Sequence, residues 1–120
     1  MKRTGQENFL DYIPVKNPEI EWKTNGENLA VLAMENKGFF NKAAQLIFKK
    51  PKVSYIELDE FGTFVWQQIN GKQTVYVIGE QVKGQFGEKA EPLYTRLCTY
   101  IKTLRNHNFI HLERQMFYNV

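Results

Sequence analysis

The chain has 120 residues and a mass of 14.2 kDa, enough for one folded domain with a core. Its hydrophobic fraction of 42%, about 49% with the 8 glycines, is ordinary for a globular protein and excludes a disordered chain. The longest apolar run, residues 29–34, is too short to cross a bilayer, and no apolar stretch follows the initial Met-Lys-Arg. We therefore expect no membrane span and no signal peptide. The single cysteine, Cys98, excludes an internal disulfide and indicates a reducing compartment, so a soluble cytoplasmic protein is expected.

The formal net charge of +3 is too small to imply nucleic-acid binding by itself. Residues 37–52, however, contain five lysines and no acidic residue. We interpret them as the solvated face of a short helix; the alternative is a surface for an acidic partner. These lysines are Lys37, Lys42, Lys49, Lys50 and Lys52.

The N-terminal third is predicted to be loose at first and then to form strands. We expect no fixed structure in the first dozen residues, with Pro14 and Pro18 keeping the following chain extended. Apolar and polar residues alternate over 19–24, which predicts a strand. A second strand over 27–34 is apolar on both faces, so we place it at the centre of the sheet.

The turn between these two strands is predicted from Asn25-Gly26. This dipeptide favours a two-residue type I′ hairpin turn, which needs positive φ at both central residues. A loop of that length fixes the register, with Trp22 opposite Leu29 and Ile20 opposite Val31.

A helix is predicted over residues 39–50, stopped by Pro51, and a third strand over 53–58. Two further helices are predicted over 60–69 and 75–86.

Capping residues define the ends of these helices. Asp59 and Thr74 are expected at the N-termini of the two helices, and Asn70-Gly71 and Gly87 at their C-termini. Within the helix over 75–86, Gly79 and Gly84 are each expected to weaken it by about 1 kcal/mol relative to alanine.

The last helix begins at Pro92 and should end near His107, with Asn108 in the left-handed conformation. Residues 110–120 alternate enough to predict a final strand. Together these elements predict a single α+β domain of winged-helix type, an N-terminal antiparallel β-sheet packed on a three-helix bundle. The basic helix at about 39–50 would be an insertion in it.

Residues 54–87 resemble the PqqD family, the small chaperone of pyrroloquinoline quinone biosynthesis, also called the RiPP recognition element. The resemblance depends on several helix ends and spacings together. It is carried by Leu58-Asp59, Gly62, Trp66, Asn70-Gly71, Thr74-Val75 and Phe86-Gly87, and by the spacing of Leu97, Leu104 and Phe109-Ile110. We expect Trp66 to be structural and to pin the helix over 60–69 to the sheet.

The resemblance implies a non-catalytic adaptor without a cofactor. It would capture the leader of a ribosomally made precursor peptide by strand addition and present it to a radical SAM or other peptide-modifying enzyme. The implied peptide-binding groove is formed by the third strand and the last helix. Its residues are Val53, Ser54, Tyr55, Ile56, Glu57, Arg96, Thr99, Tyr100 and Thr103.

The residues of the third strand are consistent with an open sheet edge. The second strand must be central, and residues 53–58 contain no proline to prevent pairing. Alternation predicts Ile56 and Leu58 toward the core, and Tyr55 and Glu57 on the opposite face.

Catalytic or metal chemistry is not predicted. The only soft metal ligands are Cys98, His107 and His111, which we interpret as a core thiol and two surface histidines in preference to a zinc site. No glycine-rich phosphate loop is present in the sequence.

Two other functions stay open as alternatives. A winged helix could bind DNA through its basic residues, although two acidic residues lie near the entry of the last helix and do not favour it. The basic residues are Arg96, Lys102, Arg105 and Arg114, and the acidic ones Glu88 and Glu91. The chain could also be a self-associating module, for example a homodimer.

Overall fold

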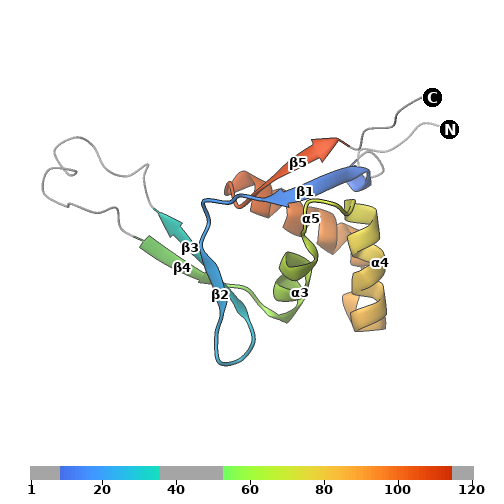
Figure 1. The fold of residues 1–120 in the computed structure, drawn as a ribbon. Helices are drawn as coiled ribbons and strands as arrows, with labels where there is room; N and C mark the ends of the chain where they lie inside the picture. The colour runs from blue at the N-terminus through green and yellow to red at the C-terminus, as the bar shows by residue number, and fades with distance from the viewer. Residues whose placement is uncertain (1–8, 36–52, 115–120) are drawn as a thin grey trace, which may run out of the picture. The chain divides into compact units, whose positions relative to one another are not determined.

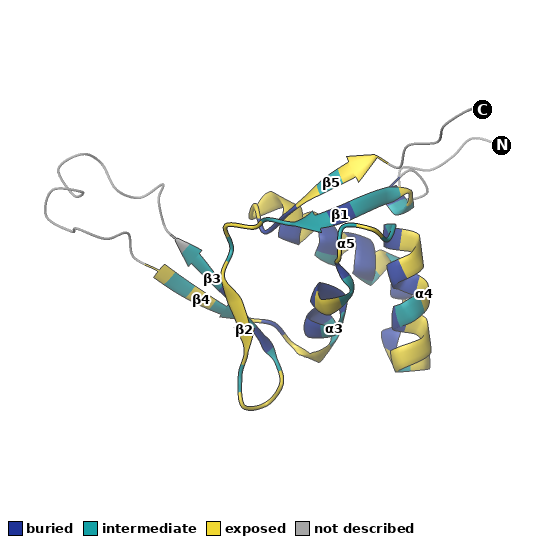
Figure 2. Cartoon of the chain, viewed as in Figure 1, coloured by how far each residue is buried: buried dark blue, intermediate teal, exposed yellow. Residues whose placement is uncertain are grey.

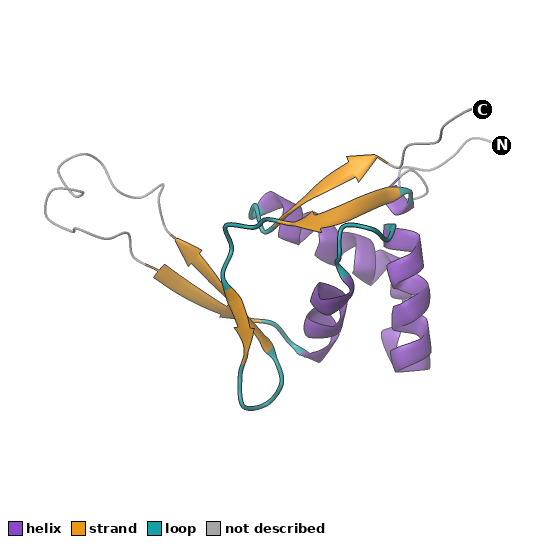
Figure 3. Cartoon of the chain, viewed as in Figure 1, coloured by secondary structure: helices purple, strands orange, loops and turns teal. Residues whose placement is uncertain are grey.

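A computed structural model describes residues 9–35 and 53–114. The chain divides into two compact units, the helical unit (Met1–Asn17 with Phe61–Val120) and the sheet unit (Pro18–Glu60). Antiparallel sheets and three α-helices are present in the described part (Figure 3), which confirms the mixed α+β class. The winged-helix arrangement stays a prediction, and the predicted helix over 39–50 lies outside the described residues.

Within residues 18–35 and 53–60, the sheet unit contains three antiparallel strands in the order β2-β3-β4 (Figure 1). They are β2 (Trp22–Thr24), β3 (Ala30–Glu35) and β4 (Val53–Glu57). The predicted central position of the second strand is therefore confirmed. β3 carries the fully buried Ala30 and Leu32, as expected for a strand with neighbours on both sides.

The register between β2 and β3 differs from the predicted one. The observed pairs are Trp22 with Leu32, Lys23 with Val31 and Thr24 with Ala30. The predicted pairing of Trp22 with Leu29 and of Ile20 with Val31 is therefore wrong. Relative to the prediction, the partner of Trp22 has shifted by three residues, an odd number that exchanges the two faces of the strand.

The side chain of Asn25 explains the longer loop. Its Oδ1 accepts hydrogen bonds from the backbone N–H groups of Glu27 at 2.9 Å and Leu29 at 3.0 Å. The left-handed residue is Asn28, with φ of 62°, and Gly26 is not among the glycines with positive φ. An asparagine-capped loop thus replaces the type I′ turn, because Asn25 satisfies loop N–H groups that a two-residue turn would not contain.

The helical unit contains a second, two-stranded sheet that the sequence did not predict. β1 (Tyr12–Lys16) pairs antiparallel with β5 (Ile110–Arg114), and Figure 1 shows the two strands side by side. The expectation of a loose start is wrong from Phe9 onward, because Phe9 is buried. The predicted final strand is confirmed over the residues of β5.

Helices also lie in the described residues of this unit. They are α3 (Glu60–Gln68), α4 (Val75–Phe86), η2 (Gly87–Ala90) and α5 (Leu93–Asn106). Each α-helix turns one face inward, drawn dark blue in Figure 2. The buried apolar side chains on and beside these helices are Val65, Trp66, Ile69, Val75, Ile78, Val82, Leu93, Leu97, Ile101 and Leu104.

The predicted caps of α4 are confirmed, Asp59 as the N-cap of α3 stays a prediction, and α5 begins at Leu93, one residue after the predicted Pro92. Thr74 Oγ1 accepts from the N–H of Val77 at 3.2 Å, which makes Thr74 the N-cap of α4. Gly71, Gly87 and Asn108 have φ of 77°, 57° and 61°, positive values that favour glycine and asparagine.

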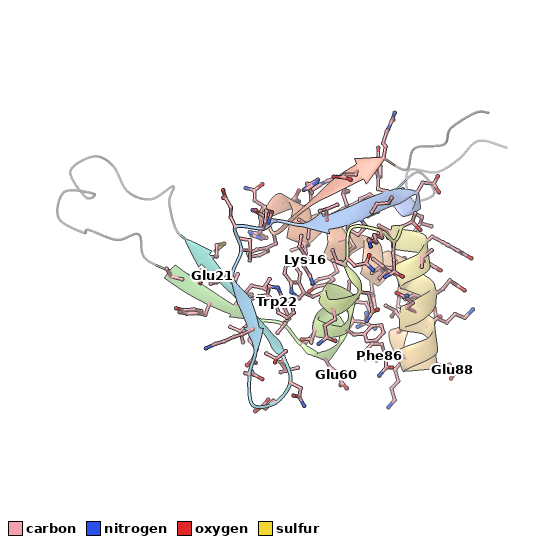
Figure 4. The ribbon with its side chains drawn as sticks, in the orientation of Figure 1. Lys16, Glu21, Trp22, Glu60, Phe86 and Glu88 are labelled. Atoms are coloured by element: carbon pink, nitrogen blue, oxygen red, sulfur yellow. The ribbon has the colours of Figure 1, made fainter. Side chains whose placement is uncertain are left out.

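Trp66 is fully buried, as predicted for a structural residue. The Nζ of Lys16, a residue labelled in Figure 4, lies 5.0 Å from the centroid of the Trp66 ring. Burial lowers the pKa of Lys16, because the protein interior disfavours the charged ammonium. Trp66 therefore connects α3 with β1 inside the helical unit.

We predict that Trp66→Ala destabilises the protein by about 3–5 kcal/mol, because it leaves a large cavity in the core. Chemical denaturation followed by circular dichroism measures the change. A soluble variant that unfolds cooperatively with near wild-type stability would contradict the structural role of Trp66.

Candidate functional site

The strongest candidate site is the outer edge of β4. β4 pairs with β3 on one side, and within residues 9–35 and 53–114 no strand pairs with its other side. Such an edge presents backbone donors and acceptors to a further strand.

The hydrogen bonds of β3 identify which groups of β4 face outward. The N–H of Ala33 donates to the carbonyl of Glu21 at 2.9 Å, so the polar groups of Ala33 face β2. The N–H of Leu58, just after β4, donates to the carbonyl of Ala30 at 2.8 Å. The direction of the backbone polar groups alternates from one residue to the next along a strand. The β4 residues that pair with Ala33, and with every second residue of β3 counted from it, therefore point their N–H and C=O groups away from β3.

The register therefore divides the residues of β4 into those whose backbone groups face β3 and those whose backbone groups face the outer edge. Ser54 and Ile56 pair with residues of β3 whose polar groups face β4, so they belong to the β3–β4 ladder. Val53, Tyr55 and Glu57 turn their N–H and C=O groups to the outer edge. All five predicted residues of the third strand thus lie on β4, but only three offer their backbone to a ligand.

The side chains of these three residues also share one exposed face. Tyr55 is 71% exposed and Val53 is 38% exposed, and Glu57 is exposed as well. Ile56 is half-buried and Leu58 is buried. The predicted distribution of side chains over the two faces of this strand is confirmed.

The carboxylate of Glu57 is held in place by a neighbouring side chain. Asn25 Nδ2 donates to Glu57 Oε2 over 2.7 Å. The ion pairs found in the described part of the chain do not include Glu57. The negative charge of Glu57 therefore lies next to the outer edge of β4, and no cationic side chain among the described residues forms an ion pair with it.

Two of the four predicted residues on α5 contact the first turn of α3. The guanidinium carbon of Arg96 lies 4.4 Å from the centroid of the Phe61 ring, and its Nη1 donates to the carbonyl of Lys89 at 3.0 Å. Tyr100 Oη donates to the carbonyl of Gly62 at 3.0 Å, and its ring meets Phe61 edge-on. These contacts give Arg96 and Tyr100 a packing role within the helical unit.

The other two predicted residues on α5, Thr99 and Thr103, are exposed. Thr103 Oγ1 donates to the carbonyl of Thr99 at 2.9 Å, one turn earlier on the same helix. The residues on α5 and those on β4 belong to different compact units, so a groove formed by both sets stays a prediction.

Metal ligation and thiol chemistry find no support in the described residues. No three His, Cys, Asp or Glu side chains among them form a group that could hold a metal ion. Cys98 is buried, and burial raises the pKa of its thiol, so the reactive thiolate is disfavoured. His111 pairs instead with Glu113, with 2.9 Å between Nε2 and Oε2.

A cluster on α4 and α5 was not found from the sequence. The rings of Tyr76 and Tyr94 are stacked with centroids 6.1 Å apart, and Tyr94 Oη donates to Glu80 Oε2 at 2.6 Å. Burial and this hydrogen bond raise the pKa of Tyr94. Gly79 makes room for the ring, because a Cβ there would lie 2.5 Å from Tyr94 Cε1. The spacing of Tyr76, Gly79 and Glu80 along one helix was visible in the sequence. Nothing in the sequence indicated that Tyr94 on α5 would be their partner.

Within the parts of the chain that the structure describes, no helix is both long and apolar enough to span a membrane. These parts define a small α+β protein with a three-stranded sheet whose two edge strands are β2 and β4. A family model described as Coenzyme PQQ synthesis protein D (PqqD) matches residues 42–110, more than half of the chain. The chain therefore belongs to the PqqD family, as its resemblance predicted. No curated protein and no solved structure matches it.

The family match includes β4, all three α-helices and the first residue of β5. It is consistent with an accessory, peptide-binding role in coenzyme PQQ or RiPP biosynthesis. Nothing supports the alternative of DNA binding. Two of the basic residues considered for that role lie over aromatic rings, Arg96 over Phe61 and Lys102 over Phe9.

The two glycines of α4 lead to opposite predictions, contrary to the expectation that both simply weaken the helix. Gly79→Ala should destabilise the protein by about 1–2 kcal/mol, because the added methyl group displaces the Tyr94 ring from its stack. A Cβ at Gly84 would meet no neighbouring atom within 4 Å, so Gly84→Ala should stabilise α4 by about 0.5–1 kcal/mol. Thermal denaturation measures the change in stability of both variants. A Gly79→Ala variant more stable than the wild type would contradict the packing of Tyr94.

Proposed function

We propose that this protein is a non-catalytic adaptor of peptide biosynthesis. It captures the leader of a ribosomally made precursor peptide as an added strand on β4 and presents it to a radical SAM or other peptide-modifying enzyme. The observation that carries this proposal is the outward direction of the backbone groups of Val53, Tyr55 and Glu57. Such an adaptor needs no cofactor or metal of its own, and its place of action would be the cytoplasm.

Backbone pairing alone does not account for useful affinity. Three residues offer up to six hydrogen-bonding groups, and each bond contributes about 1 kcal/mol net. A micromolar complex needs about 8 kcal/mol after association costs of at least several kcal/mol. Side chains beside the edge must supply the remainder, and the exposed ring of Tyr55 is the largest apolar group there.

The family resemblance also implies peptide contacts for the four residues predicted on α5, which belongs to the other compact unit. Thr99 and Thr103 are exposed and accessible to a ligand. Arg96 and Tyr100 are engaged with α3, so their substitution would also disturb packing. Tests of binding are therefore cleaner on β4 than on α5.

Titration of ¹⁵N-labelled protein with synthetic peptides that tile a candidate precursor tests the proposed function. A binding leader segment should move the amide signals of Val53, Tyr55 and Glu57, while duplex DNA at low and at moderate salt should leave the spectrum unchanged. Shifts that avoid both β4 and α5, or a response to DNA alone, would overturn it. Concentration-dependent shifts at β4 without peptide would indicate a homodimer through this edge.

Proline substitutions on β4 test the assigned direction of its backbone groups. Tyr55→Pro removes an outward N–H, so it should weaken peptide binding at least tenfold with modest loss of stability. The control Tyr55→Ala separates the loss of the ring from the loss of the donor. Ile56→Pro removes an N–H of the β3–β4 ladder and should destabilise the sheet strongly. Equal effects of the two prolines on stability would contradict the assigned register.

A further inference from the structure

The exposed face of β4 combines an aromatic and an acidic side chain two residues apart. Tyr55 and Glu57 point to the same face, and both are exposed beside the outer edge of the strand. The hydrogen bond from Asn25 fixes the position of the Glu57 carboxylate. An incoming strand would therefore meet an apolar ring and a fixed negative charge in a defined order.

Strand geometry determines which residues of a ligand meet these groups. Side chains of an added strand alternate between the two faces of the sheet, so residues two apart share a face. Side chains directly opposite each other on neighbouring strands are close enough to interact, and opposite charges at such positions are favourable. Two ligand residues separated by one would thus lie beside Tyr55 and Glu57.

Over residues 18–60 the sheet unit contains seven acidic residues and six lysines, so a basic partner is favoured by the charges of its described residues and not by the net charge of the unit. Over residues 18–34 and 53–60 the sequence contains six acidic residues and one lysine. An acidic peptide on β4 would meet like charge at Glu57, which is unfavourable in a cross-strand pair. The acidic residues are Glu19, Glu21, Glu27, Glu57, Asp59 and Glu60, and the lysine is Lys23.

We propose that the ligand of β4 is an extended peptide with an apolar side chain beside Tyr55 and a lysine or arginine beside Glu57, two residues apart. This inference rests on the proposed function, strand addition at β4, and specifies the chemistry of the peptide. Glu57 and Tyr55 then act as the residues that select the ligand, while the backbone of β4 binds it without regard to sequence.

A set of synthetic 11-residue peptides tests the pattern. All share one Thr/Ser/Gln frame with blocked ends and carry Leu-Thr-Lys, Leu-Thr-Gln, Leu-Thr-Glu or Ser-Thr-Lys at the centre; a second set has the central order reversed, for the opposite strand direction. Dissociation constants come from amide shifts of β4. In one of the two orders, the lysine peptide should bind about fivefold tighter than the glutamate peptide, and added salt should reduce that difference.

Variants of the protein assign the preference to particular side chains. Glu57→Gln keeps an oxygen to accept from Asn25 but removes the charge, so the lysine preference should disappear. Glu57→Lys should reverse it. Glu27→Lys, an equal charge change at an exposed loop position of the same unit, should leave it intact. Tyr55→Ser should weaken the Leu-Thr-Lys peptide more than the Ser-Thr-Lys peptide.

The outcomes separate this inference from the proposed function. If peptides move the β4 amides but bind equally with lysine or glutamate, or if Glu27→Lys changes the preference as Glu57→Lys does, the assigned pattern is wrong and strand addition stands. If neither these peptides nor a candidate precursor moves the β4 amides, both fail. A reversal seen only with Glu57→Lys supports the assignment.

Discussion

The alternation of backbone polar groups along β4 is the constraint on which the rest of this account depends. A strand in a sheet turns successive N–H and C=O groups to opposite sides, so pairing with β3 uses only every second residue. The bonds at Ala33 and Leu58 fix the phase of this alternation. They leave the groups of Val53, Tyr55 and Glu57 for the outer edge, where the same three residues also expose their side chains.

Features with local causes could be predicted from the sequence. The ends of α4 follow from the Thr74 hydroxyl and from the positive φ of Gly87, both of which act within one helical turn. The buried face of α5 follows from apolar spacing, and β4 follows from its position between a predicted helix stop and a helix start. For the same reason, the position of residues 53–57 on a strand and the two faces of that strand were predicted correctly, while their role in peptide binding stays a prediction.

Features that depend on distant partners could not be predicted. β1 forms only because β5, almost a hundred residues later, supplies its ladder, and no local signal marks that pairing. The β2–β3 register depended on the Asn25 side chain bonding into its own loop, which overrides the preference of Asn-Gly for a tight turn. Likewise, the contacts of Arg96 and Tyr100 with Phe61, and of Tyr94 with Gly79, depend on how helices meet.

Amide hydrogen exchange on β4 is the most direct test of the open edge. In the free protein, the amides of Ser54, Ile56 and Leu58 should exchange slowly because they belong to the β3–β4 ladder, whereas those of Val53, Tyr55 and Glu57 should exchange fast. A bound leader peptide should slow the second group alone. Protection of all six amides before any ligand is added would show that the edge is already covered, and would contradict the account.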